Sequence, residues 1–519
     1  MLRTEYGRQG NEDADPVLPA ANPQSSSVSA LDALLLFMLF NLSLQPLVDP
    51  DFGWHLRTGL DLITNWTLPE TDPYSHTVPD WRWVEHAWLM DGLIGLMYRG
   101  AGGLGVIVVF GAVIAGAFIV GVASVAASRT TKLLAVVVVA WLALPFLGAR
   151  MQMVTLLGLA VVLEFWRRYR DGRLSRLWAL PPLFVLWANL HGGFTAGLFT
   201  LGIVLAISCA ARFGITRYPS LSRRIDEPVL SWVQIRHFAL ILALAALSTL
   251  LNPYGWRLHG EIYASLTDRF MIDTLYEWQP VSLHRRAGAT YAAYLAVLTG
   301  MGVLWYRRTE PVRWAITLVF LVLSLRHWRN VPFFLLVSLP LLADMLTELR
   351  RRLLMFLAAA RWSLRYLAFG AALVAALAMV LLGADHLQRV AQSGLAPEAF
   401  FKDTEYPIEA VQWIEAHRDQ LGKRLYNDYG AGGFLLWWRP ADKIFIDGRM
   451  PAWRVGDRWI LYDYLALTNR DPPELGVLDK YQVDWAIVER DTLLERALAA
   501  RPEWRAIYQD RKVSIYVKA

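Results

Sequence analysis

The sequence predicts a polytopic α-helical membrane protein that carries a soluble α/β domain at its C-terminal end. The 519 residues are 55% hydrophobic and only 18% charged, and the mean hydropathy is +0.32. Apolar runs of about 17 to 25 residues, the length that crosses a bilayer as a helix, follow one another through most of the chain. Residues 386–519 instead alternate between short helical and short strand patterns.

Loop charge orients the predicted spans. Five linkers rich in Arg and Lys all fall on the cytoplasmic face if there are eleven spans and the N-terminus lies inside. Counting the apolar stretch 86–99 as a span would break this agreement, so we interpret it as an interfacial helix in the first external loop. The predicted spans are Ala30–Leu47, Leu104–Ala127, Leu133–Leu147, Val154–Phe165, Leu177–Leu190, Thr195–Ala211, Trp232–Leu251, Ala289–Trp305, Trp314–Leu325, Val331–Ala343 and Leu367–Leu382.

This topology predicts three regions. Residues 1–28 are polar and contain Pro and Ser, which is typical of a disordered cytoplasmic tail and not of a cleavable signal peptide. Residues 29–385 form the transmembrane domain, with external loops at 48–103 and 252–288, and residues 386–519 form an external domain. The net charge of +6 follows from the basic linkers, so it indicates no nucleic-acid partner, and one cysteine allows no intrachain disulfide.

Short patterns in the C-terminal domain predict its elements. Periodicity predicts a helix over Ile408–His417, and composition predicts a turn over Asn427–Gly433. Four segments rich in apolar and β-branched residues predict short strands, namely Arg424–Asn427, Ile444–Asp447, Trp485–Val488 and Val513–Val517.

Asp49-Pro50-Asp51 lies where the first predicted span ends. One interpretation is a helix stop followed by an N-cap, because Asp51 precedes an apparent helix start. The other is a functional site, because carboxylates near a bilayer are energetically expensive. Asp51 and His55 are four residues apart and share a helical face, which would suit a common divalent cation; a plain interfacial role for His55 is the alternative.

Charged residues also mark the later external segments. Glu277 is either functional or a surface acid paired with Arg285 or Arg286. Arg326 and Arg329 lie at the external end of a late span, where the positive-inside rule disfavours basic residues unless they bind something. These two arginines therefore predict an anion site.

Histidines and tryptophans on the same face allow two interpretations each. His191 could hydrogen-bond a phosphate or a sugar, whereas Gly192 and Gly193 beside it are also explained by a tight turn. His86 faces either a cavity or the membrane interface. The Trp-rich stretch 81–88 is either an aromatic belt or a platform for sugar stacking.

Four external segments resemble the catalytic subunit of oligosaccharyltransferase and its bacterial and archaeal single-subunit relatives, which belong to the GT-C class of membrane glycosyltransferases. The order of the segments along the chain agrees with that family. A similar start and a similar Asp-Gly-Arg segment occur in bacterial membrane proteins that are commonly grouped with GT-C enzymes. The segments here are Asp49-Pro50-Asp51-Phe52, Leu275-Tyr276-Glu277-Trp278-Gln279-Pro280, Arg326 with Arg329, and Asp428-Tyr429-Gly430 followed by Asp447-Gly448-Arg449.

The resemblance implies a glycosyltransferase of the bacterial inner membrane with a periplasmic or extracellular C-terminal domain. It would move a sugar or glycan from a polyprenyl-phosphate or polyprenyl-pyrophosphate donor to a glycan, lipid or protein acceptor at the external face. A divalent cation, Mg²⁺ or Mn²⁺, would be held by Asp49, Asp51 and His55. The implied roles are catalysis for Asp49, Asp51 and Glu277, donor-phosphate binding for Arg326, Arg329 and His191, and acceptor contacts for Asp428, Tyr429, His55 and His86.

Two departures from the family pattern bear on this reading. The acidic motif of the second external loop is replaced by Gly148-Ala149-Arg150-Met151-Gln152, which has no carboxylate. Tyr426-Asn427 stands where the family has Trp-Trp, so an acceptor other than a peptide sequon is expected. Two other function classes remain open: a transporter or flippase of lipid-linked sugars, and a non-catalytic GT-C-like assembly protein, which the missing carboxylate favours.

Overall fold

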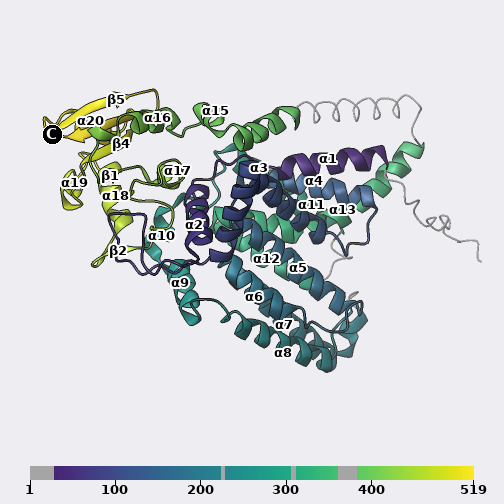
Figure 1. Ribbon diagram of the computed structural model, residues 1–519. Helices are drawn as coiled ribbons and strands as arrows, with labels where there is room; N and C mark the ends of the chain where they lie inside the picture. Colours follow the sequence, from purple (N-terminus) through teal and green to yellow (C-terminus); the bar gives the residue numbers. More distant parts are fainter. Residues whose placement is uncertain (1–28, 224–227, 306–310, 360–382) are drawn as a thin grey trace, which may run out of the picture.

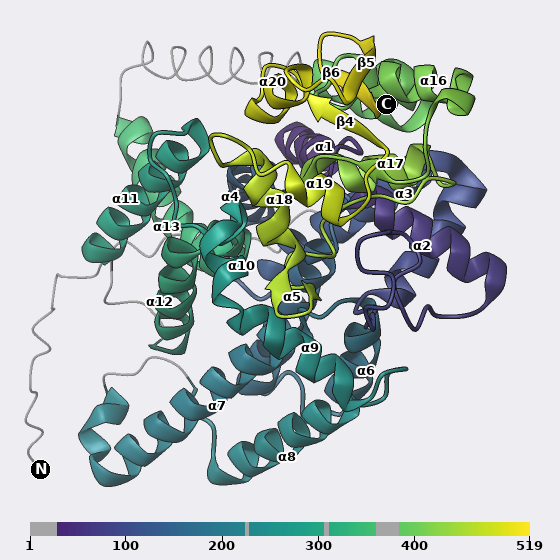
Figure 2. The same ribbon diagram turned by 90° about the vertical axis from the view of Figure 1, so that its left-hand side faces the viewer.

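The computed structural model describes residues 29–223, 228–305, 311–359 and 383–519. Most helices pack into one large region, and a small sheet with its own helices lies at one end of it (Figure 1). Helices α2 and α17 meet where these two regions join, as both views show (Figures 1 and 2). The site described below forms at this junction.

Each predicted span within the described residues corresponds to a helix, and Leu367–Leu382 lies outside those residues. The α-helices of this region are α1 Ala30–Ser43, α2 Phe52–Asn65, α3 Trp88–Gly121, α4 Arg129–Ala143, α5 Gln152–Arg170, α6 Leu180–Leu190, α7 Phe194–Arg217, α8 Trp232–Ser248, α9 Trp256–Thr267, α10 Arg269–Thr274, α11 Arg286–Trp305, α12 Pro311–Arg326 and α13 Val331–Ala359. The 3₁₀ turns are η1 Leu144–Phe146, η2 Pro219–Arg223, η3 Tyr276–Trp278 and η5 Trp328–Asn330.

The length and composition of these helices support a membrane location. Among the described residues, four helical segments are long and apolar enough to cross a bilayer: Trp88–Gly121, Arg129–Phe146, Phe194–Arg217 and Trp328–Phe356. Helices α1, α6 and α8 are apolar but shorter, with 14, 11 and 17 residues. The count of eleven spans is therefore not confirmed and stays a prediction.

Helix α3 contains most of the stretch 86–99, which the sequence predicts to be an interfacial helix. The element runs from Trp88 to Gly121 and consists of two helices that meet at a kink. Gly102 breaks the helical geometry within it, with φ 61° and ψ −160°. Because glycine adopts positive φ without a steric penalty, the chain can turn here and resume the helix at once. The predicted interfacial helix and the predicted second span are thus joined at a glycine.

The C-terminal domain is built on a four-stranded sheet with strand order β1-β4-β6-β5. Strand β1 runs parallel to β4, whereas β6 is antiparallel to both β4 and β5. Its helices are α15 Pro397–Lys402, α16 Ile408–Ala416, α17 Gly432–Trp438, α18 Ile460–Thr468, α19 Gly476–Lys480 and α20 Leu493–Ala499, with 3₁₀ turns η6 Arg418–Gln420 and η7 Tyr429–Ala431. Its strands are β1 Leu425–Tyr426, β4 Trp485–Glu489, β5 Trp504–Gln509, β6 Val513–Lys518 and the separate hairpin β2 Arg454–Val455 with β3 Arg458–Trp459.

The predicted helix over residues 408–417 and three of the four predicted strands are confirmed, whereas the predicted strand Ile444–Asp447 is wrong. Its backbone is extended but pairs with the first external loop. The N–H of Ile444 donates to the carbonyl of Tyr74, and the N–H of His76 donates to the carbonyl of Ile444. Because the loop takes these hydrogen-bonding groups, the segment forms only an isolated bridge there.

A buried ion cluster fastens the first external loop to the C-terminal domain. The Arg449 side chain, 1% exposed, lies 2.7 Å from Asp72 of the loop and 2.8 Å from the neighbouring Asp447. The guanidinium also lies about 5 Å from the ring centres of Tyr74, Trp83 and Trp453, a cation–π arrangement. One cation thus compensates two buried carboxylates that belong to distant parts of the chain.

We expect Arg449→Met to destabilise the fold by about 3–5 kcal/mol, because it leaves Asp72 and Asp447 buried without their cation. Unfolding of the full chain in detergent by heat or denaturant measures the change. The matched control is Arg505→Met, since Arg505 is an exposed arginine on β5 of the same domain. Equal stability of the two variants would contradict the role given to the ion cluster.

Candidate active site

Asp51 occupies the N-cap position of α2 but does not cap it. Its side chain makes no cap hydrogen bond and instead accepts the indole N–H of Trp54 at 3.1 Å. The Asp51 backbone N–H donates to Oδ1 of Asp49 at 2.9 Å. The Asp51 side chain therefore does not cap α2, and the capping interpretation is wrong.

Two glycines of the C-terminal domain receive the Asp49–Asp51 loop. The carbonyl of Pro50 lies where a Cβ on Gly433 would stand, and Oδ1 of Asp51 lies where a Cβ on Gly448 would stand. A side chain at Gly433 would push the Pro50 backbone away, and one at Gly448 would displace the Asp51 carboxylate. Gly448 of the Asp447-Gly448-Arg449 segment thus lies directly against the Asp51 carboxylate.

Four carboxylates influence one another at this junction. The pKa of Asp51 is raised to about 7, chiefly by burial and then by the negative charges of Asp49, Glu277 and Asp447. A carboxylate with such a pKa can accept a proton near neutral pH, as a general base must. Tyr429 faces the same charges, because burial first and then Asp51, Glu277 and Asp447 raise its pKa.

Two arginines pair with members of this group. Arg150, in the turn before α5, forms an ion pair with Asp49. Arg329 in η5 donates to Glu277 at 2.9 Å and lies 4.3 Å from the ring centre of Trp278. Glu277 is therefore not paired with Arg285 or Arg286 in the manner of a surface acid; Arg285 stacks on Tyr276 instead.

Sequence reasoning missed Arg150 as a site residue. In the sequence, the turn that contains Arg150 differs from the family pattern by lacking a carboxylate. Arg150 could have been identified as Arg329 was, because both are basic residues in predicted external turns.

The hydrogen bonds of His191 determine which of its ring nitrogens carries the proton. Its Nδ1 accepts the backbone N–H of Gly193 at 3.2 Å and pairs with the Thr155 hydroxyl at 2.7 Å. Because a backbone N–H can only donate, Nδ1 carries no proton in this arrangement, and the proton of the neutral ring is on Nε2. Gly193 is needed here, since a Cβ would collide with the Thr155 hydroxyl.

Three histidines of the site are neutral at physiological pH. Burial, followed by the nearby His55 and Arg329, lowers the pKa of His86 to about 4. Burial, followed by His86 and Arg329, lowers the pKa of His191 well below 6.5. Burial also lowers the pKa of His55 to about 3. The rings of His86 and His191 lie 5.8 Å apart, so these side chains offer hydrogen bonds to a ligand without adding charge.

Two of the predicted residues lie apart from this cluster. Asp428 accepts the backbone N–H of Glu489 at the end of β4 at 3.1 Å, and burial raises its pKa to about 6. Arg326 is exposed at the end of α12, and no contact within the described residues ties it to the cluster. The structure thus separates Arg329 from Arg326, which the sequence had treated as a pair.

The proposed metal ligands do not fit a common divalent cation. The Asp49 carboxylate is engaged by Arg150, and Nδ1 of His55 lies 2.7 Å from Asp91 of α3. His55 therefore links α2 to α3. Its side chain is not placed to bind a cation together with Asp51. Within the part of the chain that the structure describes, no three His, Cys, Asp or Glu side chains are grouped to hold a metal ion.

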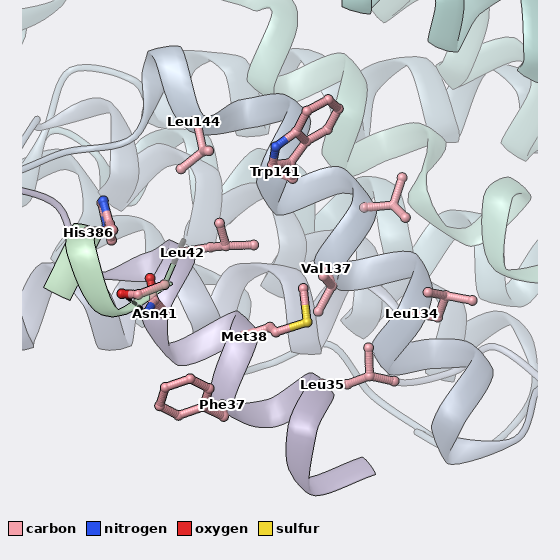
Figure 3. A pocket seen from close by; sticks show the side chains of 12 residues that line it. Leu35, Phe37, Met38, Asn41, Leu42, Leu134, Val137, Trp141, Leu144 and His386 are labelled. Atoms are coloured by element: carbon pink, nitrogen blue, oxygen red, sulfur yellow. Dashed lines mark hydrogen bonds between the residues drawn. The ribbon is translucent and has the colours of Figure 1, made fainter. Parts of the chain in front are cut away.

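An apolar pocket of about 440 Å³ lies beside α1 and α4 (Figure 3). Its polar side chains are Asn41, which donates to the carbonyl of Gly383 at 2.7 Å, and His386. The elements that line it, α1 and η1, are followed in the chain by Asp49 and Arg150. The remaining lining is apolar and includes Leu35, Phe37, Met38, Leu42, Leu134, Val137, Val138, Trp141 and Leu144.

The raised pKa of Asp51 predicts a pH-dependent stability. The folded protein binds a proton at Asp51 more tightly than the unfolded chain does, so this carboxyl destabilises the fold as pH rises from about 4 to above 7. We expect the melting temperature of the wild type to fall relative to Asp51→Asn across this range. Asp403→Asn, at an exposed position, is the control. A constant difference between wild type and Asp51→Asn would contradict the raised pKa.

Comparison with known proteins supports the fold. The sequence matches no protein-family model and no curated protein. Two solved structures of the Archaeoglobus fulgidus oligosaccharyltransferase are similar, each at 13% identity over 88% of this chain and 69% of that chain. One is tethered to an acceptor peptide with an NVT sequon, with a TM-score of 0.55. The other, named AglB, is in complex with an inhibitory peptide and a dolichol-phosphate, with a TM-score of 0.57. The chain therefore has the fold of an archaeal oligosaccharyltransferase, as its motifs predicted.

Proposed function

We propose that this chain is a membrane glycosyltransferase that moves a sugar or glycan from a polyprenyl-phosphate or polyprenyl-pyrophosphate donor to an acceptor at the external membrane face. The observation that carries the proposal is the Asp51 carboxylate, with a pKa of about 7, at a junction where Arg150 pairs with Asp49 and Arg329 pairs with Glu277. A base of this kind and cations for a departing phosphate are what glycosyl transfer from such a donor requires.

The acceptor half of the reaction is assigned to Asp51. Its carboxylate takes the proton of the acceptor hydroxyl as the hydroxyl oxygen attacks the anomeric carbon. The bond between this carbon and the phosphate oxygen breaks, and the electron pair leaves with the polyprenyl phosphate or pyrophosphate. Because this leaving group is stable as an anion, the reaction needs no strong general acid.

The donor half is assigned to Arg329 and His191. The planar guanidinium of Arg329 suits phosphate oxygens, and its present partner, Glu277, is a half-exposed side chain that a phosphate could displace. The Nε2–H of His191 adds a neutral donor. The apolar pocket beside α1 and α4 supports the proposal by providing hydrocarbon surface next to the segments that carry Asp49 and Arg150.

The region of Tyr426 and Asn427 argues for an acceptor other than a peptide sequon. Both side chains are fully buried. Asn427 donates to the carbonyl of Ile446 at 2.8 Å and accepts the N–H of Phe445 at 2.8 Å. These residues therefore hold the segment before Asp-Gly-Arg in place and present no surface to an acceptor. A hydroxyl of a glycan or lipid is the acceptor that we propose.

Substitution of the Asp51 carboxylate tests the base. We expect Asp51→Asn to lower transfer by at least about 10²-fold, because the proton acceptor is lost. Transfer is measured with a membrane extract of mixed polyprenyl-linked sugars and detected by mass spectrometry of labelled glycans. Asp403→Asn is again the control. Undiminished transfer by Asp51→Asn would remove the base from the mechanism and favour a non-catalytic assembly protein.

The two arginines of η5 and α12 can be told apart by kinetics. We expect Arg329→Ala to raise the KM for the polyprenyl-linked donor about tenfold or more, because a charge-assisted hydrogen bond to phosphate is lost. Arg326→Ala, which removes an exposed guanidinium, should have a much smaller effect. Equal KM values for the two variants would show that Arg329 does not bind the donor.

A further inference from the structure

Three of the four carboxylates at the junction have an arginine partner. Asp49 pairs with Arg150, Glu277 pairs with Arg329, and Asp447 shares Arg449 with Asp72. Among the four carboxylates, Asp51 is the one for which the described residues include no ion pair. Its hydrogen-bond donor is the neutral indole of Trp54. Most of the carboxylates that could bind a divalent cation here are therefore already engaged by a guanidinium.

Arg150 does more than neutralise one partner. The carboxylate of Asp49 that it engages also accepts the backbone N–H of Asp51 on its Oδ1 at 2.9 Å. Arg150 thus fixes the carboxylate that lies next to Asp51. About a third of the Arg150 side chain is exposed, whereas the Asp49 side chain is 7% exposed. The ion pair therefore lies where the junction between the two regions meets solvent.

The position of Arg150 is informative. It belongs to Gly148-Ala149-Arg150-Met151-Gln152, the turn that holds no carboxylate although the oligosaccharyltransferase pattern has an acidic motif there. A guanidinium is always charged, is planar, and fixes a carboxylate through directed hydrogen bonds. A divalent cation bound by carboxylates also orients them and offsets their charge. A guanidinium and a divalent cation can therefore substitute for each other at a site that needs only oriented carboxylates and an offset of their charge.

We propose that the Arg150 guanidinium takes the place of a divalent cation in this chain. It holds Asp49 in position and offsets the negative charge that faces Asp51, and a metal ion is not needed for the site to assemble. One consequence is that glycosyl transfer proceeds without a divalent cation, and this consequence rests on the proposed function. The other consequence is that the chain binds no divalent cation at this site, and it does not depend on the proposed function.

Binding of Mn²⁺ to the purified full-length chain tests the substitution directly. Electron paramagnetic resonance measures free Mn²⁺ during a titration, and thermal unfolding in detergent compares Mn²⁺ with EDTA. We expect no saturable site and no shift of the melting temperature in the wild type. Stoichiometric Mn²⁺ binding that EDTA reverses, with a matching shift, would overturn the proposal.

Variants at position 150 sharpen the test. Arg150→Gln frees the Asp49 carboxylate beside Asp51, so we expect Mn²⁺ to bind about tenfold or more tightly than to the wild type. Arg150→Lys keeps the charge and should remain insensitive to Mn²⁺. Arg57→Gln is the matched control, because Arg57 pairs with Asp61 on the neighbouring helix α2 at 3.0 Å. If Arg150→Gln gains no more Mn²⁺ affinity than Arg57→Gln, the guanidinium does not occupy a cation site.

The transfer assay separates this inference from the proposed function. Transfer by the wild type that is unchanged in EDTA supports both. Transfer that EDTA abolishes and Mn²⁺ restores supports the proposed function and overturns the role of Arg150. A wild type that transfers nothing but follows the expected Mn²⁺ behaviour, including the gain in Arg150→Gln, contradicts the proposed function and supports the substitution of a cation by Arg150.

Discussion

The buried guanidinium of Arg449 is the interaction on which the arrangement of the site depends. It pairs with both Asp72, in the loop between α2 and α3, and Asp447 of the C-terminal domain. Removing a charge of this kind from water is expensive, so the three groups stay together only in the geometry that pairs them. That geometry brings Gly448, one residue before Arg449, against the Asp51 carboxylate. The buried ion pair and the contact with the Asp51 carboxylate are thus made by the same three residues of sequence, Asp447-Gly448-Arg449.

The difference between Asp49 and Asp51 follows from this arrangement. The two carboxylates are two residues apart, and the sequence alone left open which one would be reactive. Asp49 is neutralised by Arg150, whereas Asp51 is half-buried, accepts the indole N–H of Trp54 and faces other negative charges. The first is held as an anion by a permanent partner, and the second can exchange a proton near neutral pH. Neighbouring residues with the same side chain therefore differ in their surroundings, and the proposed roles of Asp49 and Asp51 differ for this reason.

Much of the helical architecture could be predicted from the sequence because apolar runs and basic linkers are local patterns. The clustering of Asp49, Asp51, Glu277, Arg329 and Tyr429 was also anticipated, since the predicted topology put them on one face. The rest depends on contacts between distant segments. Asn427 gave no signal that it would hold Phe445 and Ile446, and Ile444 looked like a strand because its pairing partner lies in another loop. No local pattern shows that Arg150 pairs with Asp49 or that His55 pairs with Asp91.

The site joins segments that lie far apart in the sequence. The proposed base, Asp51, lies near residue 50, and the glycine and arginine of the segment that packs against it lie near residue 450. A ribosome must therefore synthesise everything between these two segments before they can meet. Until then the Asp51 carboxylate is open to water, where a carboxyl is a weak base. If Asp51 is the base that we propose, a chain that stops before residue 448 would lack the surroundings that raise its pKa.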